Sequence, residues 1–259
     1  MSLWRLEWLR LSRTRRLLAL AAVFVLFGLG SPLLTRYLSE VLAASTPAGG
    51  IKIVAPDPTP ADGIASYQKN VQQLGAVLLA FVAAATFRGK AEVFLRTRIT
   101  RRRDHVLPGL VVVTSAAWAC YLAGLLGAWY ETAVLLGGPG VVAMLATAGF
   151  TLLYLAFAVA LTLAIASFTR TAVPAGFAAT ALLLVVLPLL TGVRSIGKYL
   201  PPDLPGSALS LVAGTSVPSD HWRAVAVTLV ATGALVAVGL SRAPRARPAP
   251  RGTGRRRPA

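Results

Sequence analysis

The chain alternates between long runs of apolar residues and shorter polar connections. Six of the runs have at least the roughly 17 residues that an α-helix needs to cross the hydrocarbon layer of a membrane. The sequence therefore predicts an all-α, polytopic membrane protein whose transmembrane domain covers residues 1–241. The six predicted spans are residues 17–35, 71–87, 106–130, 141–168, 171–193 and 224–241.

Residues 2–16 precede the first span and have the pattern of an amphipathic helix. Trp4, Trp8 and Leu11 recur at i, i+4 and i+7, and arginines occupy much of the rest of the helical wheel. A helix of this kind lies in the headgroup layer, with Trp at the interface and Arg toward anionic lipid. We therefore expect an elbow helix. An unstructured basic leader is the alternative. The first span itself reads as a signal-anchor, with a cleaved signal peptide as its alternative.

The longer connections are rich in proline or arginine. Residues 39–70 contain the stretch VAPDPTPADG, whose prolines disfavour a helix, so we expect a loop outside the bilayer. Residues 194–223 form a second proline-rich connection, and its apolar middle, 208–213, is expected to dip into the membrane interface. Residues 242–259 carry seven arginines among Pro, Gly and Ala, which predicts a disordered basic tail.

Basic residues are distributed unequally between the two sides of the predicted spans. Charged residues make up 14% of the chain, against about 25% in soluble domains. Of the 26 Lys and Arg residues, 20 fall on the side that carries both termini and 6 on the other, whereas the 9 acidic residues divide into 3 and 6. The positive-inside rule makes the first side cytoplasmic. Topology and anionic lipid therefore account for the net charge of +17 without a nucleic-acid partner.

Residues 88–105 form a basic island between the second and third spans, which we call the coupling segment. The segment reads RGKAEVFLRTRITRRRDH and lies on the predicted cytoplasmic side. A charged segment between two spans can dock a soluble partner, and the alternative is a basic loop that faces lipid alone. Glu92 could contact such a partner or form a local ion pair with Arg88 or Arg96, at i−4 and i+4.

The third predicted span carries a ridge of small residues. Ala116, Cys120, Gly124 and Ala128 recur every four residues, a spacing that lets another helix approach closely. We expect these residues to pack helices together. Cys120 is the single cysteine of the chain, so an intramolecular disulfide is excluded.

The sequence offers no catalytic or metal-binding constellation. His105 and His221 fall on opposite sides of the predicted membrane, so they cannot share a metal. The predicted spans carry no Asp, Glu, Lys or Arg except at their ends, which argues against a proton- or ion-coupled carrier. We therefore expect neither an enzyme nor a bound cofactor, and no energy source within the chain.

The layout resembles the type-2 permease family of ATP-binding-cassette (ABC) transporters. The resemblance is carried by EWLRLSRTRRLLAL (7–20), by IVAPDPTPADGIASYQKNVQQLG (53–75) and by AEVFLRTRITRR (91–102), together with the six spans. It implies that the coupling segment docks on a separate ABC ATPase subunit, which binds ATP and Mg²⁺. The residues that match the family's acidic position and Arg-containing turn are Glu92, Arg98 and Arg101, and Arg96 lies between them.

This resemblance implies a permease subunit of an ABC exporter in the bacterial cytoplasmic membrane. Such a subunit pairs with a second copy or a related permease and exports a hydrophobic or amphipathic substrate. The alternative is a non-transporting membrane anchor or assembly factor, which would bind lipid or protein through its basic segments. A neighbouring reading frame for a small ATPase with GxxxxGK[ST] would favour the exporter.

Overall fold

A computed structural model describes residues 3–45, 58–88, 102–192 and 197–241, and within these ranges every regular element is a helix. Six helical segments are long and apolar enough to cross a membrane, as the sequence predicts. They are Arg16–Tyr37, Pro60–Phe87, Val106–Leu135, Val141–Phe168, Ala172–Thr191 and Pro218–Ser241. The predicted basic tail and most of the coupling segment lie outside the described residues.

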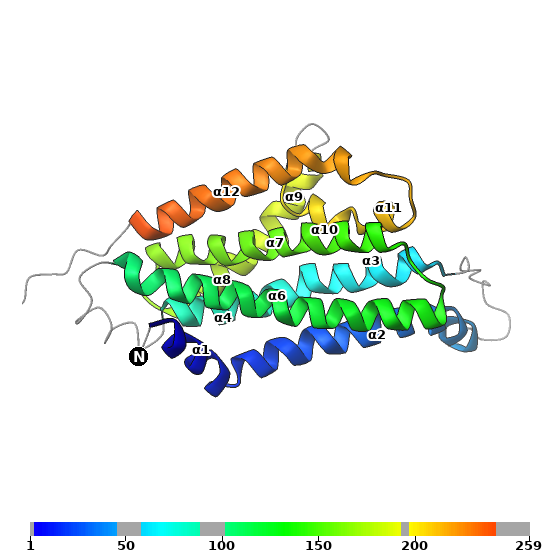
Figure 1. Ribbon diagram of the computed structural model, residues 1–259, viewed down its shortest axis with the longest axis horizontal. Helices are drawn as coiled ribbons and strands as arrows, with labels where there is room; N and C mark the ends of the chain where they lie inside the picture. Colours follow the sequence, from blue (N-terminus) through cyan, green and yellow to red (C-terminus); the bar gives the residue numbers. More distant parts are fainter. Residues whose placement is uncertain (1–2, 46–57, 89–101, 193–196, 242–259) are drawn as a thin grey trace, which may run out of the picture.

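The segments form one elongated bundle, with the short helices grouped on one side (Figure 1). Its elements are α1 (Leu3–Arg13), α2 (Arg16–Ser45), α3 (Pro60–Asn70), η1 (Val71–Gly75), α4 (Ala76–Phe87), α6 (Arg102–Leu135), α7 (Val141–Phe168), α8 (Ala172–Ala181), η2 (Leu182–Val186), α9 (Leu187–Thr191), η3 (Gly197–Tyr199), α10 (Asp203–Gly206), α11 (Ala208–Val212), η4 (Pro218–His221) and α12 (Trp222–Ser241). α1, the end of α4, the start of α6 and the end of α12 lie together at one end of the bundle, called the inner end below (Figure 1).

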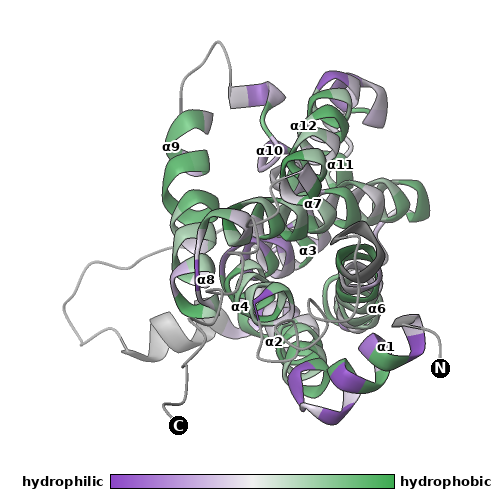
Figure 2. Ribbon diagram, turned by 90° about the vertical axis from the view of Figure 1, so that its left-hand side faces the viewer, coloured by the Kyte–Doolittle hydropathy of each residue, from purple (hydrophilic) through white to green (hydrophobic). Residues whose placement is uncertain are grey.

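The N-terminal helix α1 turns against the bundle at the inner end. A turn with Arg15 at a φ of 56° separates it from α2. Leu11 is buried against Val82 and Ala116, whereas Trp4 and Trp8 stay exposed. Residues 3–13 are therefore helical, with Leu11 on the bundle and both tryptophans on the outer side of the helix. Figure 2 shows α1 at the rim of the bundle with hydrophilic residues along it.

The prediction of a loop over residues 39–70 is wrong at both ends. α2 continues to Ser45, because no Gly or Pro interrupts the chain between Pro32 and Pro47. α3 begins at Pro60, where a proline costs no hydrogen bond because the first helical N–H is free. Thr59 and Asp62 form a capping box that fixes this start. α3, η1 and α4 then run on as a single span, 11 residues longer than predicted.

α7 is the central helix of the bundle and has the predicted bounds, 141–168. In the end-on view it lies between α12, α6, α4 and α8 (Figure 2). Of its most apolar 18-residue segment 67% is buried, against 17% for the sixth span. α7 is therefore the most enclosed of the six segments, whereas Pro60–Phe87 and Val106–Leu135 are half buried and the last two segments are mostly exposed.

The connection between the fifth and sixth spans folds into short helices that pack on the bundle. α11 contacts α3 and α7, and Leu204, Ala208 and Leu211 are buried. Residues 208–212, which the sequence predicts to dip into the membrane interface, form the helix α11, in which Ala208 and Leu211 pack on the bundle and Leu209 stays exposed. α12 starts short of the end that α2 and α3 reach, and α10 and α11 fill this space (Figure 1).

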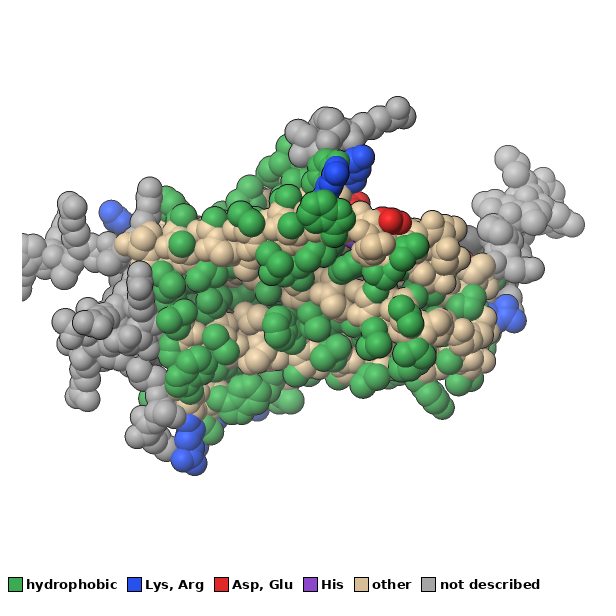
Figure 3. Space-filling model, turned by 45° about the horizontal axis from the view of Figure 1, so that its top comes forward, with side chains coloured by type: hydrophobic (Ala, Val, Ile, Leu, Met, Phe, Trp, Pro, Cys, Tyr) green, Lys and Arg blue, Asp and Glu red, His purple; other side chains and the backbone are tan. Residues whose placement is uncertain are grey.

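Charged side chains lie at the ends of the bundle and above the short helices that precede α12, while hydrophobic ones cover its length (Figure 3). This distribution is typical of a protein that sits across an apolar layer. It differs from a soluble helical bundle, whose outer surface is mostly polar.

α2 and α6 make the closest backbone contact between two long helices, at Gly28 and Gly124. A Cβ atom on Gly28 would overlap the carbonyl oxygen of Gly124, and one on Gly124 would overlap the carbonyl oxygen of Phe24. Backbones at this separation permit Cα–H···O contacts, which favour association where lipid weakens the hydrophobic effect. Ala116, Cys120, Gly124 and Ala128 are all buried in the chain itself.

We expect Gly28→Ala to lower the free energy of unfolding by about 1–3 kcal/mol, because the added methyl group must push two helix backbones apart. Gly30→Ala is the matched control, since nothing lies within 4 Å of a Cβ atom at that position. Reversible unfolding in mixed micelles measures both variants. Equal stability of the two would contradict the close contact.

Candidate functional site

One turn of α3 carries polar side chains into the interior of the bundle. Gln68 donates from Nε2 to the Tyr121 hydroxyl at 2.7 Å, and its Oε1 lies 3.0 Å from the Thr151 hydroxyl. The Tyr67 hydroxyl donates to the carbonyl oxygen of Tyr121 at 3.0 Å. All four residues are at most 1% exposed. The network joins α3 to α6 and α7 and satisfies polar groups that lipid could not.

Two further contacts fix the rotation of α3. The rings of Tyr67 and Tyr121 stack with centroids 5.9 Å apart, and the Asn70 amide donates to the Ser31 hydroxyl of α2 at 2.9 Å. Because these side chains point into the core, the next face of the same helix is turned away from it. Lys69 of α3 lies on that second face, which Gln72 and Gln73 continue in η1.

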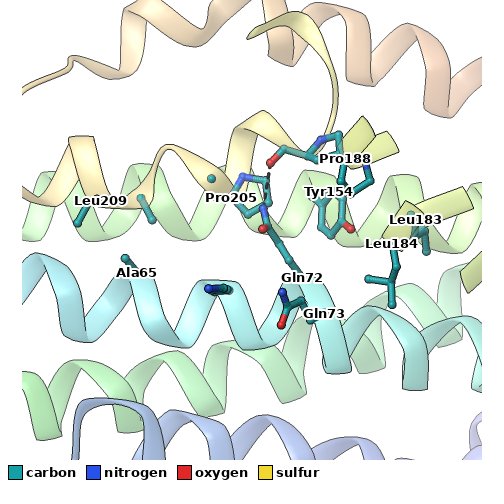
Figure 4. A pocket seen from close by; sticks show the side chains of 13 residues that line it. Ala65, Gln72, Gln73, Tyr154, Leu183, Leu184, Pro188, Pro205 and Leu209 are labelled. Atoms are coloured by element: carbon teal, nitrogen blue, oxygen red, sulfur yellow. Dashed lines mark hydrogen bonds between the residues drawn. The ribbon is translucent and has the colours of Figure 1, made fainter. Parts of the chain in front are cut away.

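The second face of α3 borders a cavity of about 460 Å³ between α3, α7, η2 and α10. Its polar lining comes from Lys69, Gln72, Gln73 and Tyr154, and the leucines of η2 and α11 add apolar walls. Figure 4 shows Gln72 and Gln73 on one side of the cavity, with Leu183, Leu184 and Pro188 opposite. The volume lies within the range of about 300–1,000 Å³ that is usual for small-molecule sites.

A π-helical turn lies beside the cavity on each of two walls. In η1 the amide of Ala76 donates to the carbonyl of Val71, and in η2 the amide of Leu187 donates to that of Leu182. Pro188, which has no N–H to offer the preceding turn, accounts for the widening of η2. Such turns are frequent at functional sites.

The short helix α10 closes the cavity and is held from two sides. Gln72 donates from Nε2 to the carbonyl oxygen of Pro202 at 2.9 Å, and Asp203 lies 3.6 Å from His221. Burial raises the pKa of the Asp203 carboxyl, and His221 opposes that rise. On the far side of α10, Tyr199 and Arg223 line a second cavity with the Asp203–His221 pair. α10 therefore lies between two cavities, with the Gln72–Pro202 hydrogen bond beside the first and the Asp203–His221 pair beside the second.

At the inner end, the predicted docking residues Glu92, Arg96, Arg98 and Arg101 lie outside the described residues. The coupling segment begins at Arg88, which is described and donates from Nε to the carbonyl oxygen of Ala166. This bond ties the end of α4 to the end of α7. A guanidinium group at a helix C-terminus is also favoured by the helix dipole.

The small residues of α6 serve packing within the chain rather than the cavity. Gly124 faces α2, and Ala116 packs with Leu11 of α1 and Val82 of α4. Because the ridge is covered by the chain's own helices, a second permease would have to pair through a different face.

The sequence analysis missed Gln68, Lys69 and Tyr154. Lys69 was expected in an outer loop, and it lies instead in α3, within the candidate span Pro60–Phe87. A usable signal was present in Thr59-Pro60-Ala61-Asp62, since a capping box with proline at the first helical position marks a helix start. Tyr154 sits in an apolar run and shows no pattern in the sequence that separates it from a packing aromatic.

We expect Tyr121→Phe to lower the free energy of unfolding by about 1–2 kcal/mol, because the Gln68 amide loses its buried acceptor. Tyr130→Phe is the matched control, since Tyr130 lies on the same helix and is 67% exposed. Unfolding in mixed micelles measures the difference. A loss in Tyr130→Phe as large as that in Tyr121→Phe would count against the network.

Comparisons of the chain with protein-family models, with curated proteins and with solved structures give no match. The functional proposal therefore rests on the residues and geometry of this chain.

Proposed function

We propose that the chain is the membrane-spanning subunit of an ABC exporter in the bacterial cytoplasmic membrane, with both termini in the cytoplasm. A separate ATPase subunit would bind ATP and Mg²⁺ and dock on the coupling segment. The cavity between α3, α7 and η2 would hold the cargo on its way out. Six spans, the charge distribution and the resemblance described above support this proposal.

The observation that carries the proposal is the convergence of the cavity walls at the inner end. α4 continues into η1, α7 bears Tyr154, and α8 continues into η2, so each wall traces back to a helix that reaches this end. Arg88 bonds α4 to α7. A movement of the coupling segment would therefore reach three walls of the cavity at once.

The contact between α4 and α8 makes these helices a packed unit. The rings of Phe81 and Phe177 meet edge to face with centroids 5.1 Å apart, and a Cβ atom on Gly176 would lie 2.6 Å from the Phe81 ring. Packed helices move as rigid bodies because their interfaces are not continuously deformable. This packing supports transmission from the coupling segment to the cavity without any long-range electrostatic effect.

The opposite end supports an outward gate. α10 packs on the bundle through the buried residues Leu204 and Pro205, and it is also bonded to Gln72 and paired with His221 through Asp203. The polar contacts can exchange as the helix moves, but opening would also require Leu204 to leave its packing site. We assign the short helices 197–221 the role of closing the outer side of the cavity.

A second permease is expected to pair through the least buried spans. Only 22% of the apolar segment of Ala172–Thr191 and 17% of that of Pro218–Ser241 is buried. These faces replace the small-residue ridge as the candidate surface for a second copy or a related permease, and otherwise they face lipid.

We expect charge reversal in the coupling segment, Glu92→Arg together with Arg98→Glu, to abolish co-purification of an ATPase subunit from native membranes and the ATPase activity of the complex. Arg36→Glu is the control, because Arg36 is exposed and lies far along α2 from the inner end. Affinity purification in mild detergent and mass spectrometry measure the association.

A stoichiometric ATPase that is lost on segment reversal but kept in Arg36→Glu supports the exporter. Purification without any ATPase, also after cross-linking in native membranes, rejects it and favours an anchor or assembly protein. Retention of the ATPase in the segment variant would show that docking occurs elsewhere on the chain.

A further inference from the structure

The cavity beside α3 has a chemistry that selects among the hydrophobic and amphipathic substrates expected above. We propose that it binds an anionic single-chain amphiphile, with the acidic headgroup at Lys69 and Tyr154 and the chain along Leu183, Leu184 and Leu209. That this molecule is the exported cargo rests on the proposed function. The binding itself does not.

The charge of the headgroup follows from Lys69. Among the described residues that line the cavity it is the single charged one. No described carboxylate lies within ion-pair distance of it, since Asp62 is engaged with Thr59 and Asp203 with His221. Lys69 is exposed at the margin of the cavity, so an anionic headgroup in the cavity could form an ion pair with its ammonium group.

The position of Lys69 along its helix is consistent with an acidic headgroup. The helical span Pro60–Phe87 has 28 residues, which corresponds to about 42 Å of helix, whereas the hydrocarbon layer is about 30 Å thick. Lys69 lies nine residues, or about 13 Å, from the start of this helix, a distance close to the excess length of about 12 Å. A lysine at this level can keep its ammonium group in the interfacial layer, where the headgroup of an amphiphile also lies.

Tyr154 is the second, independent indication. Its side chain lines the cavity and is 1% exposed, yet its hydroxyl has no hydrogen-bond partner among the described residues. This hydroxyl is not one of the fully buried polar atoms without a partner, so it opens onto the cavity, where a ligand can reach it. Figure 4 shows the Tyr154 ring directed into the space between Gln72 and Leu184. A headgroup oxygen in that space would supply the missing partner.

The remaining walls favour a chain rather than a second polar group. Leu183, Leu184 and Pro188 of the fifth span and Leu209 of α11 lie along the cavity, and Figure 4 shows them on its sides. Gln73, which is exposed at the margin, can donate to the headgroup while Gln72 stays bonded to Pro202. One cation, one unpaired hydroxyl and one amide match an alkyl phosphate or a fatty acid.

The test uses the purified full-length protein in zwitterionic nanodiscs without an ATPase. The probe is an alkyl phosphate with a diazirine in its chain, and cross-linked peptides are mapped after illumination. We expect labelling at Leu183, Leu184 and Leu209, with competition by dodecyl phosphate. Dodecylphosphocholine and inorganic phosphate are expected to compete at least about ten-fold more weakly, because one carries a compensating charge and the other lacks a chain.

The variants separate the headgroup contacts from folding. We expect Lys69→Gln to weaken competition by dodecyl phosphate roughly ten-fold or more and Tyr154→Phe about three- to ten-fold. Lys69→Arg keeps the charge and is expected to retain most of the binding. Lys198→Gln and Tyr130→Phe are the matched controls outside the cavity, and unfolding curves confirm that each variant is folded.

Three results would overturn the proposal. They are labelling spread evenly over the lipid-facing helices, equal binding by Lys69→Gln and Lys198→Gln, and equal competition by phosphate alone. Specific labelling in a protein that recruits no ATPase would keep the binding site and reject the exporter. Recruitment of an ATPase without specific labelling would keep the exporter and reject this cargo.

Discussion

A polar side chain inside a membrane bundle must find its hydrogen-bond partners there, because lipid offers none. In this protein the constraint acts on one turn of α3, where Tyr67 and Gln68 bond to Tyr121 and Thr151. Their bonds fix the rotation of the helix about its axis. The adjoining positions, Lys69 and Gln72, are thereby directed to the cavity, so the binding surface depends on a network that does not line it.

The two ends of the cavity are built with different kinds of contact. Toward the inner end, α4 and α8 are joined by aromatic packing and α4 and α7 by the bond from Arg88 to Ala166. Toward the outer side, α10 packs through Leu204 and Pro205 and also makes polar contacts to Gln72 and His221. Polar contacts exchange more easily than packed apolar surfaces, so this side of the cavity combines both kinds of contact.

Apolar run length was sufficient to predict the number of spans and, for α7, both ends of the helix, since Gly140 and Thr169 interrupt the apolar run where the helix stops. Run length failed for residues 60–70, because this segment is rich in polar residues and so has the composition of a loop. In the folded protein several of those polar side chains are hydrogen-bonded inside the bundle. The proline at the start of α3 was taken as a helix breaker, although the first turn tolerates it. The cavity could not be predicted, since it joins residues more than 130 positions apart through tertiary packing.

The two π turns affect how the length of this chain can change over evolution. A π turn holds one residue more than an α turn, so loss of one residue from 71–75 or 182–186 would restore ordinary α geometry and leave the flanking faces in place. Anywhere else in these spans, a one-residue deletion would rotate the two parts of the helix by about 100° relative to each other. Lys69 would then leave the cavity wall. A one-residue gap within a π turn would therefore preserve the cavity wall. A gap elsewhere in the same helix would turn the wall residues away from the cavity.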